Sequence, residues 1–289
     1  LTSRLRHLEA ERSPEIPLFI TADQEGGRVA AFRFDEFIQL PSAYNLGNRN
    51  SEDLVRAAAY VNALQLQSIG INMNLAPVLD LYPEPDRTII GDRSFGDDEE
   101  QTARYGYAFM AGTIDAGVVP VLKHFPGHGL SSVDSHGNLP VIQSLESGEL
   151  RRHLMPFIEA IQAGAPAIMT AHLLFPEIDD TYPVTLSKKF ISDLLRNELG
   201  FDGLIMTDGL AMGALAKKYS LDDTITRCFE VGIDMLLIHS RYDVSGLIDR
   251  IEAMVISGAI TTGQIDEGLL RVLITKQNAG LLSLNGQLP

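Results

Sequence analysis

The sequence predicts a single α/β domain, residues 1–289, of the TIM-type (β/α)8 barrel class, and two patterns lead to this prediction. First, short apolar runs alternate with longer amphipathic segments, as expected for parallel strands that are buried on both faces and joined by helices. Second, polar side chains recur where these runs end, and a barrel builds its active site at the C-terminal ends of its strands. These polar residues are Asp23, Asp80, Lys123, His124, His172, Asp208 and His239.

Each predicted strand is an apolar run of four to six residues without the alternation of a half-buried strand. In chain order these runs are 17–22, 71–76, 118–122, 167–170, 204–207 and 235–238. A closed barrel has eight strands. One further strand is therefore expected before Leu1, and the place of another is not evident. Residues 1–11 have the pattern of a helix interior and the chain does not begin with Met, so the natural N-terminus is expected to be missing. A cytoplasmic location is the accompanying expectation.

The helices are predicted from apolar residues that share one face and from residues that begin or end helices. Ser51 can cap the first of them, and glycines stand after most of the others. In chain order the helices are expected from Ser51 to Gly70 and over 97–116, 149–163, 187–199, 222–231, 244–256 and 262–278.

Composition and motifs exclude several classes of protein. The net charge of −15 disfavours binding to nucleic acid or to an anionic membrane surface. The single cysteine, Cys228, excludes an internal disulfide and a cysteine-rich zinc site. No apolar run approaches the roughly 18 residues of a membrane span. A doubly wound open sheet would also fit the strand–helix alternation. However, no Gly-x-Gly-x-x-Gly segment follows a strand, and no phosphate-binding lysine loop is present.

The densest group of reactive side chains lies between Lys123 and His136. His124 and His128 are four residues apart, but Pro126 between them argues against a helix, so we do not expect a metal site. Asp134 and His136 are two apart in a loop rich in Gly and Ser. A carboxylate beside an imidazole can form a general acid/base pair, although a solvated pair in a loop has the same sequence.

Three other strand ends carry candidate side chains. Asp208 can act as a nucleophile toward a sugar's anomeric carbon or as a helix cap, and Gly209 is expected to permit a turn and to remove bulk beside it. Asp23 can accept hydrogen bonds from vicinal hydroxyls. Arg93 can donate to ligand oxygens or simply form an ion pair.

Together these segments resemble the catalytic barrel of family 3 glycoside hydrolases, within its β-N-acetylglucosaminidase branch. The resemblance runs from about residue 16 to 282. Its most specific part is Lys-His-Phe-Pro-Gly-His-Gly at 123–129 with Asp-Ser-His at 134–136. The other segments, in chain order, are Asp-Gln-Glu-Gly-Gly-Arg at 23–28, Gly-Asp-Arg-Ser-Phe at 91–95 and Thr-Asp-Gly-Leu at 207–210.

The resemblance implies roles for these residues. Asp208 matches the nucleophile that forms a covalent glycosyl-enzyme with retention of configuration, and His136 matches the general acid/base, with Asp134 as its partner. The loop that carries this pair is expected to swing over the substrate. No metal and no organic cofactor is implied. Asp23, Arg93, Lys123 and His124 match contacts to the sugar hydroxyls.

Two departures from the family pattern affect sugar specificity. Ala31 stands where relatives usually have a second Arg, and residues 82–88 replace an Asn/Pro-rich loop, with Arg87 as a possible substitute for the lost Arg. If the substrate is anionic, local attraction is expected from Arg93, Arg87 and Lys123, because the whole-protein charge is negative. The absence of Trp favours capture of one terminal sugar over stacking of a long chain.

The expected activity is hydrolysis of a small glycoside by removal of terminal non-reducing N-acetylglucosamine, with peptidoglycan fragments as the expected source. Three alternatives remain. A phosphorylase on the same fold would use phosphate in place of water. A family 3 β-glucosidase or β-xylosidase would prefer another sugar. A sugar-binding barrel without catalysis would not need Asp208, Asp134 and His136. The sequence does not indicate an oligomeric state.

Overall fold

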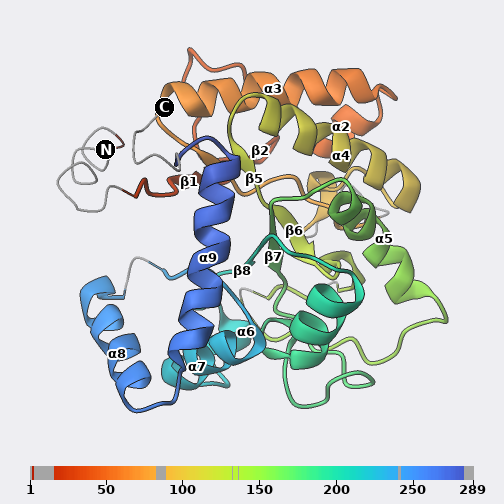
Figure 1. Cartoon of the computed structure of the whole chain (residues 1–289). Coiled ribbons are helices and arrows are strands. Elements are labelled where there is room, and N and C mark those ends of the chain that lie inside the picture. The colour runs from red at the N-terminus through yellow and green to blue at the C-terminus, as the bar shows by residue number, and fades with distance from the viewer. Residues whose placement is uncertain are drawn as a thin grey trace.

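The computed structural model describes Thr2 and residues 16–82, 89–131, 133–135, 137–239 and 242–282, in which helices alternate with short strands (Figure 1). The strands are β1 Thr21–Ala22, β2 Gln24–Gly26, β3 Val29–Ala30, β4 Met73–Asn74, β5 Val119–Pro120, β6 Leu122–Phe125, β7 Ala167–Thr170 and β8 Leu204–Thr207. The α-helices are α2 Ala43–Gly47, α3 Glu52–Ser68, α4 Glu99–Asp115, α5 Glu149–Gln162, α6 Gly213–Ala216, α7 Leu221–Val231, α8 Val244–Ile256 and α9 Thr262–Asn278. Three 3-10 helices span Gly91–Arg93, His128–Leu130 and Val184–Leu186, and a π-helix spans Lys189–Glu198.

Each parallel strand pairs with the parallel strand that follows it in the sequence within two groups. β1 pairs with β4 and β4 with β5, while β6 pairs with β7 and β7 with β8. A bridge between Val78 and Lys123 joins the two groups, and Met206 bridges to Met235, which adds one further parallel segment. A doubly wound sheet reverses its strand order at a switch point. The described strands have no such reversal, which argues against the open-sheet alternative.

The strands β4 to β8 bury both faces, as their apolar sequence predicted, whereas Thr21 in β1 is exposed. Within β7 and β8, Met169 and Met206 face an inner cluster, whereas Ile168 and Ile205 face an outer cluster beneath the helices. Phe19, before β1, and Met235, in the last segment, pack against the same inner cluster. The sheet therefore curves around a shared interior. Among the described residues no pairing joins Met235 back to β1, so these strands form a curved parallel sheet and not a closed barrel.

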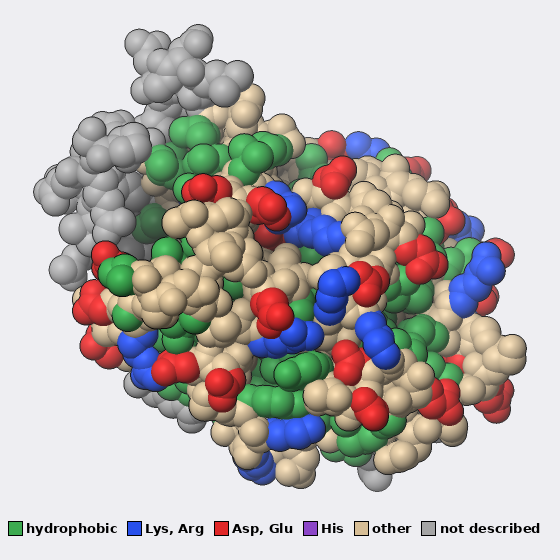
Figure 2. Space-filling model, turned by 60° about the horizontal axis from the view of Figure 1, so that its bottom comes forward, with side chains coloured by type: hydrophobic (Ala, Val, Ile, Leu, Met, Phe, Trp, Pro, Cys, Tyr) green, Lys and Arg blue, Asp and Glu red, His purple; other side chains and the backbone are tan. Residues whose placement is uncertain are grey.

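The helices lie around this sheet. In Figure 1, α2, α3 and α4 gather at one end of the molecule, α6 and α7 at the other, and α9 runs across the front. Ser51 caps α3 as predicted, because its side chain accepts a hydrogen bond from the Leu54 N–H. In the part of the chain that the structure describes, no helix combines the length and the apolar character of a bilayer span. Figure 2 shows positive and negative side chains interspersed over one face.

Several local features differ from the sequence prediction. The runs 17–22 and 71–76 contain strands of only two residues, β1 and β4, and the run 118–122 is divided between β5 and β6, which continues to Phe125. The run 235–238 contributes only one bridging residue, Met235, instead of a regular strand. The segment predicted as a helix over 187–199 is a π-helix. An antiparallel hairpin, β2 with β3, was not predicted, because strands of two and three residues are too short to show alternation.

Candidate active site

The candidate residues meet at one edge of the parallel sheet. Asp23 follows β1, Lys123 and His124 lie in β6, and Asp208 follows β8. Neighbouring parallel strands place their carboxyl ends at the same edge, so residues that are far apart in sequence come within contact distance.

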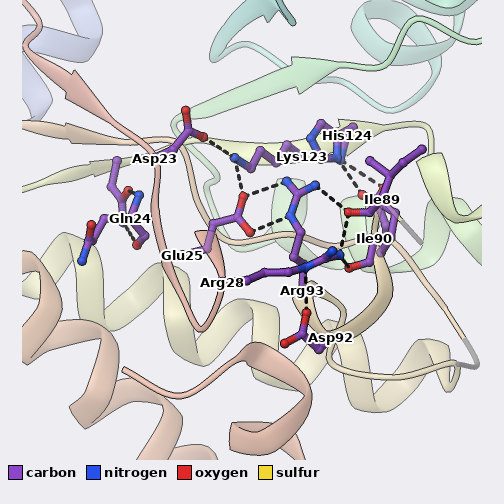
Figure 3. A network of polar contacts seen from close by, with 12 residues as sticks. Asp23, Gln24, Glu25, Arg28, Ile89, Ile90, Asp92, Arg93, Lys123 and His124 are labelled. Atoms are coloured by element: carbon purple, nitrogen blue, oxygen red, sulfur yellow. Dashed lines mark hydrogen bonds and ion pairs between the residues drawn. The ribbon is translucent and has the colours of Figure 1, made fainter. Parts of the chain in front are cut away.

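A buried carboxylate, Glu25, organises two of the predicted sugar-binding cations (Figure 3). Its Oε1 accepts from Lys123 Nζ and from Arg93 Nη2, each at 2.7 Å, and its Oε2 accepts from Arg93 Nε at 2.8 Å. Lys123 Nζ also contacts Asp23 Oδ1 at 2.7 Å. The side chains of Glu25 and Lys123 are 6% and 2% exposed, whereas that of Asp23 is 51% exposed. Asp23 is therefore the member of this network that faces solvent.

The charges of this network persist at neutral pH. Burial alone would raise the pKa of Glu25, but Lys123 and Arg93 outweigh it and lower this pKa to about 2. Burial would likewise lower the pKa of Lys123, but Glu25 and Asp23 raise it. Two carboxylates thus neutralise two cations. Both cations are therefore already paired, and the expectation that Arg93 and Lys123 attract an anionic substrate stays a prediction.

A second network centres on Asp80, which is fully buried. Its Oδ2 lies 2.7 Å from His124 Nδ1, and its Oδ1 accepts the backbone N–H groups of His124 at 3.1 Å and His128 at 2.7 Å. Burial would raise the pKa of Asp80, but His124 and His128 lower it. One ionised carboxylate therefore fixes both the His124 ring and the turn that follows it. In this turn a Cβ on Gly129 would lie 1.8 Å from the Leu81 carbonyl oxygen, so only glycine fits.

Asp208 lies directly beyond β8 and is partly exposed. Burial would raise its pKa, but His124, His172 and the Gly209 N–H lower it, so the group is a carboxylate at neutral pH. The Gly209 N–H donates to Asp208 Oδ1 at 2.7 Å, and the Gly209 carbonyl contacts His172 Nε2 at 3.2 Å. The predicted role of Gly209 was wrong. It is not in the left-handed region, and an added Cβ would make ordinary contacts to Met212 at 3.5 Å.

The third predicted group, Asp134 with His136, is described only in part. His136 lies outside the described residues. Asp134 belongs to a turn in which its carbonyl oxygen accepts from the N–H groups of Gly137 and Asn138 at 3.1 and 3.2 Å. Ser135, between the two predicted residues, is 2% exposed, and its hydroxyl lies 3.0 Å from His128 Nε2. This loop is thus in contact with the Asp80 network. Its predicted swinging motion stays a prediction.

The structure brings Asp23, Arg93, Lys123 and His124 into two joined networks at one edge. It also places Asp208 close enough to Lys123 and His124 for their charges to affect its pKa. From the sequence, Asp80 and His172 were named as polar residues at strand ends, but no role in the site was predicted for Asp80. Glu25 was named only as part of the segment at 23–28, and its support of the cations was not predicted. Among the described residues no three His, Cys, Asp or Glu side chains are grouped to hold a metal ion. Arg87 and the rest of residues 83–88 lie outside the described part.

These features define a class of protein: a parallel α/β fold whose strand ends carry an ionised carboxylate beside polar groups suited to a sugar, as in enzymes that cleave glycosides. Comparison with known proteins gives the family. Residues 1–275 match the glycosyl hydrolase family 3 N terminal domain, and the chain belongs to this family.

Relatives of this chain are named as hexosaminidases or as beta-N-acetylglucosaminidases. The chain is 34% identical over 270 residues to the Beta-hexosaminidase LpqI of Mycobacterium tuberculosis, covering 90% of this chain and 68% of that protein. It is 39% identical over 237 residues to a Beta-hexosaminidase of Nitrosomonas eutropha, covering 80% and 67%. Among solved structures, a glycoside hydrolase family 3 beta-N-acetylglucosaminidase from Paenibacillus sp. str. FPU-7 superposes with a TM-score of 0.90 at 39% identity. That match covers 96% of this chain and 53% of the other, so the chain spans about half the length of that protein.

Proposed function

We propose that this domain is a retaining, exo-acting β-N-acetylglucosaminidase that hydrolyses terminal non-reducing N-acetylglucosamine. The observation that carries the proposal is the position of Asp208, an ionised carboxylate at a strand end, electrostatically coupled to the two polar networks. The names of the relatives support the choice of sugar. Peptidoglycan fragments are the substrate class that the family resemblance suggests.

The chemistry proceeds by double displacement. A carboxylate oxygen of Asp208 attacks C1 of the sugar while the bond from C1 to the leaving oxygen breaks. The leaving oxygen takes a proton from the imidazolium of His136, which Asp134 supports. Water then attacks C1, gives its proton to the neutral imidazole and releases Asp208. Two inversions at C1 restore the original configuration.

The electrostatics of the site favour this reaction. Asp23 and Glu25 are paired with Lys123 and Arg93, and Asp80 is paired with His124. The transition state of glycoside cleavage has oxocarbenium character, and the ionised carboxylate of Asp208 stabilises the positive charge that develops. The Gly209 N–H holds one oxygen of Asp208 and so fixes the plane of its carboxylate before attack.

Sugar recognition is assigned to the first network. Asp23 is half-exposed and Lys123 holds one of its oxygens, so Asp23 can accept hydrogen bonds from sugar hydroxyls in a fixed orientation. Lys123, Arg93 and His124 are held by Glu25 and Asp80, which preorganises their remaining donors. An analogue without a matching hydroxyl would leave these buried groups unpaired and would bind less well.

We also propose that the described sheet belongs to a TIM-type (β/α)8 barrel that forms one catalytic domain over residues 1–289. The consecutive order of the parallel strands supports this proposal, as does the inner cluster to which the first and last segments both contribute.

The test is the product formed from an aryl β-N-acetylglucosaminide, followed by NMR with and without phosphate. The proposal expects free N-acetylglucosamine that appears first as the β-anomer. A sugar 1-phosphate would indicate a phosphorylase, and a first-formed α-anomer would refute retention. Faster turnover of the matching glucoside or xyloside would refute the proposed sugar, and full activity of Asp208→Ala would exclude Asp208 as nucleophile.

A further inference from the structure

The loop around the proposed acid/base is held on both sides of position 136. On one side, Ser135 is buried, its hydroxyl contacts His128 Nε2 at 3.0 Å, and its carbonyl oxygen accepts from the Ala214 N–H at 3.1 Å. On the other side, Lys217 Nζ donates to the Gly137 carbonyl oxygen at 2.6 Å and to Asn138 Oδ1 at 3.1 Å. The loop is therefore attached before and after the residue that would carry the proton.

The attachments lead to the proposed nucleophile. Ala214 belongs to α6 and Lys217 is its C-terminal cap, in the segment that follows Asp208 along the chain. The other attachment, His128, donates its backbone N–H to Asp80, which also holds His124. Movement of the loop relative to Asp208 must therefore break contacts to α6, to Lys217 or to His128.

We propose that Lys217 and Ser135 are positioning residues for the proton-transfer step, which keep the acid/base loop in register with the segment that carries Asp208. This inference rests on the proposed function, in which residue 136 is the acid/base. Neither residue needs to touch the substrate. Their contribution is geometric, and a misplacement of about 1 Å can cost on the order of 100-fold in rate.

If Lys217 contributed only to stability, its loss would lower the rate by the same factor with every substrate. Lys217 is exposed, and the interactions of exposed charged side chains contribute little to folding. If Lys217 acts through proton transfer, its loss must weigh most on substrates whose leaving group needs a proton. Glycosides with an acidic phenol as leaving group need little help from a general acid, whereas those with a weakly acidic phenol need it most.

The experiment measures kcat/KM of Lys217→Met with two aryl β-N-acetylglucosaminides, one releasing 2,4-dinitrophenol and one releasing phenol. Lys218→Met is the matched control, because Lys218 is the neighbouring exposed lysine and lies over the Tyr219 ring. We expect Lys217→Met to lose about tenfold or more with the phenyl substrate and less than about threefold with the dinitrophenyl substrate. Lys217→Arg should recover most of this loss, and the urea midpoint should match that of the control.

Ser135→Ala provides a second, independent variant and should show the same dependence on leaving group. His136→Ala calibrates the assay and should show the largest dependence. If His136→Ala shows this dependence while Lys217→Met and Ser135→Ala lose the same factor with both substrates, or behave like Lys218→Met, the positioning role is overturned and the proposed function stands. If His136→Ala shows no dependence on leaving group, the acid/base assignment fails, and the positioning role fails with it.

Discussion

Replacing Glu25 by Gln removes a charge from the centre of the site and keeps the shape of the side chain. Glu25 receives one contact from Lys123 and two from Arg93, all between 2.7 and 2.8 Å, and all three side chains are largely buried. In the variant, Lys123 keeps Asp23 as its carboxylate partner, and Arg93 loses its ion pair with Glu25. Removing one partner of a buried ion pair costs about 3–5 kcal/mol.

The pKa of Glu25 gives a second estimate of the same magnitude. Its lowering from 4.5 to about 2 corresponds, at about 1.4 kcal/mol per pKa unit, to about 3 kcal/mol of stability at pH 7. Because the folded pKa is depressed, this contribution is present above pH 4.5 and is lost as the pH falls through about 2. The loss in Glu25→Gln should therefore be about 3 kcal/mol or more at pH 7 and smaller at pH 3.5.

Urea denaturation followed by circular dichroism at both pH values measures this loss. Glu252→Gln, an exposed position on α8, is the control and should change stability by less than about 0.5 kcal/mol. A loss below about 1 kcal/mol at pH 7, or a loss equal at the two pH values, would refute the view that the ionised Glu25 organises the site.

Three further predictions follow from the second network and from the proposed chemistry. Burial, aided by His124, lowers the pKa of His128 from 6.5 to about 4, so its neutral form stabilises the fold above pH 6.5 and this contribution is lost toward pH 4. In urea denaturation, the free energy of unfolding of His128→Gln should change by about 3 kcal/mol less than that of the wild type between pH 6.5 and pH 4. An unchanged pH dependence would contradict the lowered pKa of His128. Asp80→Asn should lower kcat/KM by about 10- to 100-fold in a steady-state assay, because His124 and its turn lose their ionised anchor. Treatment with EDTA followed by desalting should leave kcat unchanged, since carboxylate and imidazole groups carry the proposed reaction, and loss of activity restored by a divalent metal would contradict it.

Much of the fold could be predicted from local patterns. Runs such as 167–170 and 204–207 are apolar on both faces because their residues alternate between the inner and outer clusters, and the structure confirms them as β7 and β8. The cap at Ser51 was also predictable, because it depends on residues within one helical turn. These features need no knowledge of tertiary contacts.

The supporting carboxylates could not be predicted in this way. Glu25 stands in the polar segment Gln-Glu-Gly-Gly-Arg, which has the composition of an exposed turn. It is buried only because Arg93, 68 residues away, and Lys123 in β6 converge on it. The partners of Asp80 likewise lie 44 and 48 residues along the chain. Sequence patterns identified side chains able to bind a sugar, but the groups that orient them depend on strand order.

The most direct test of the proposed mechanism is to identify the residue that bonds to the sugar. The enzyme is incubated with a fluorinated N-acetylglucosaminide that slows release of the glycosyl-enzyme, quenched in acid and digested, and the peptides are sequenced by mass spectrometry. The proposed mechanism predicts a glycosyl adduct on Asp208, and no adduct in Asp208→Asn. An adduct on another carboxylate, or rapid turnover through the α-anomer with no adduct, would contradict it.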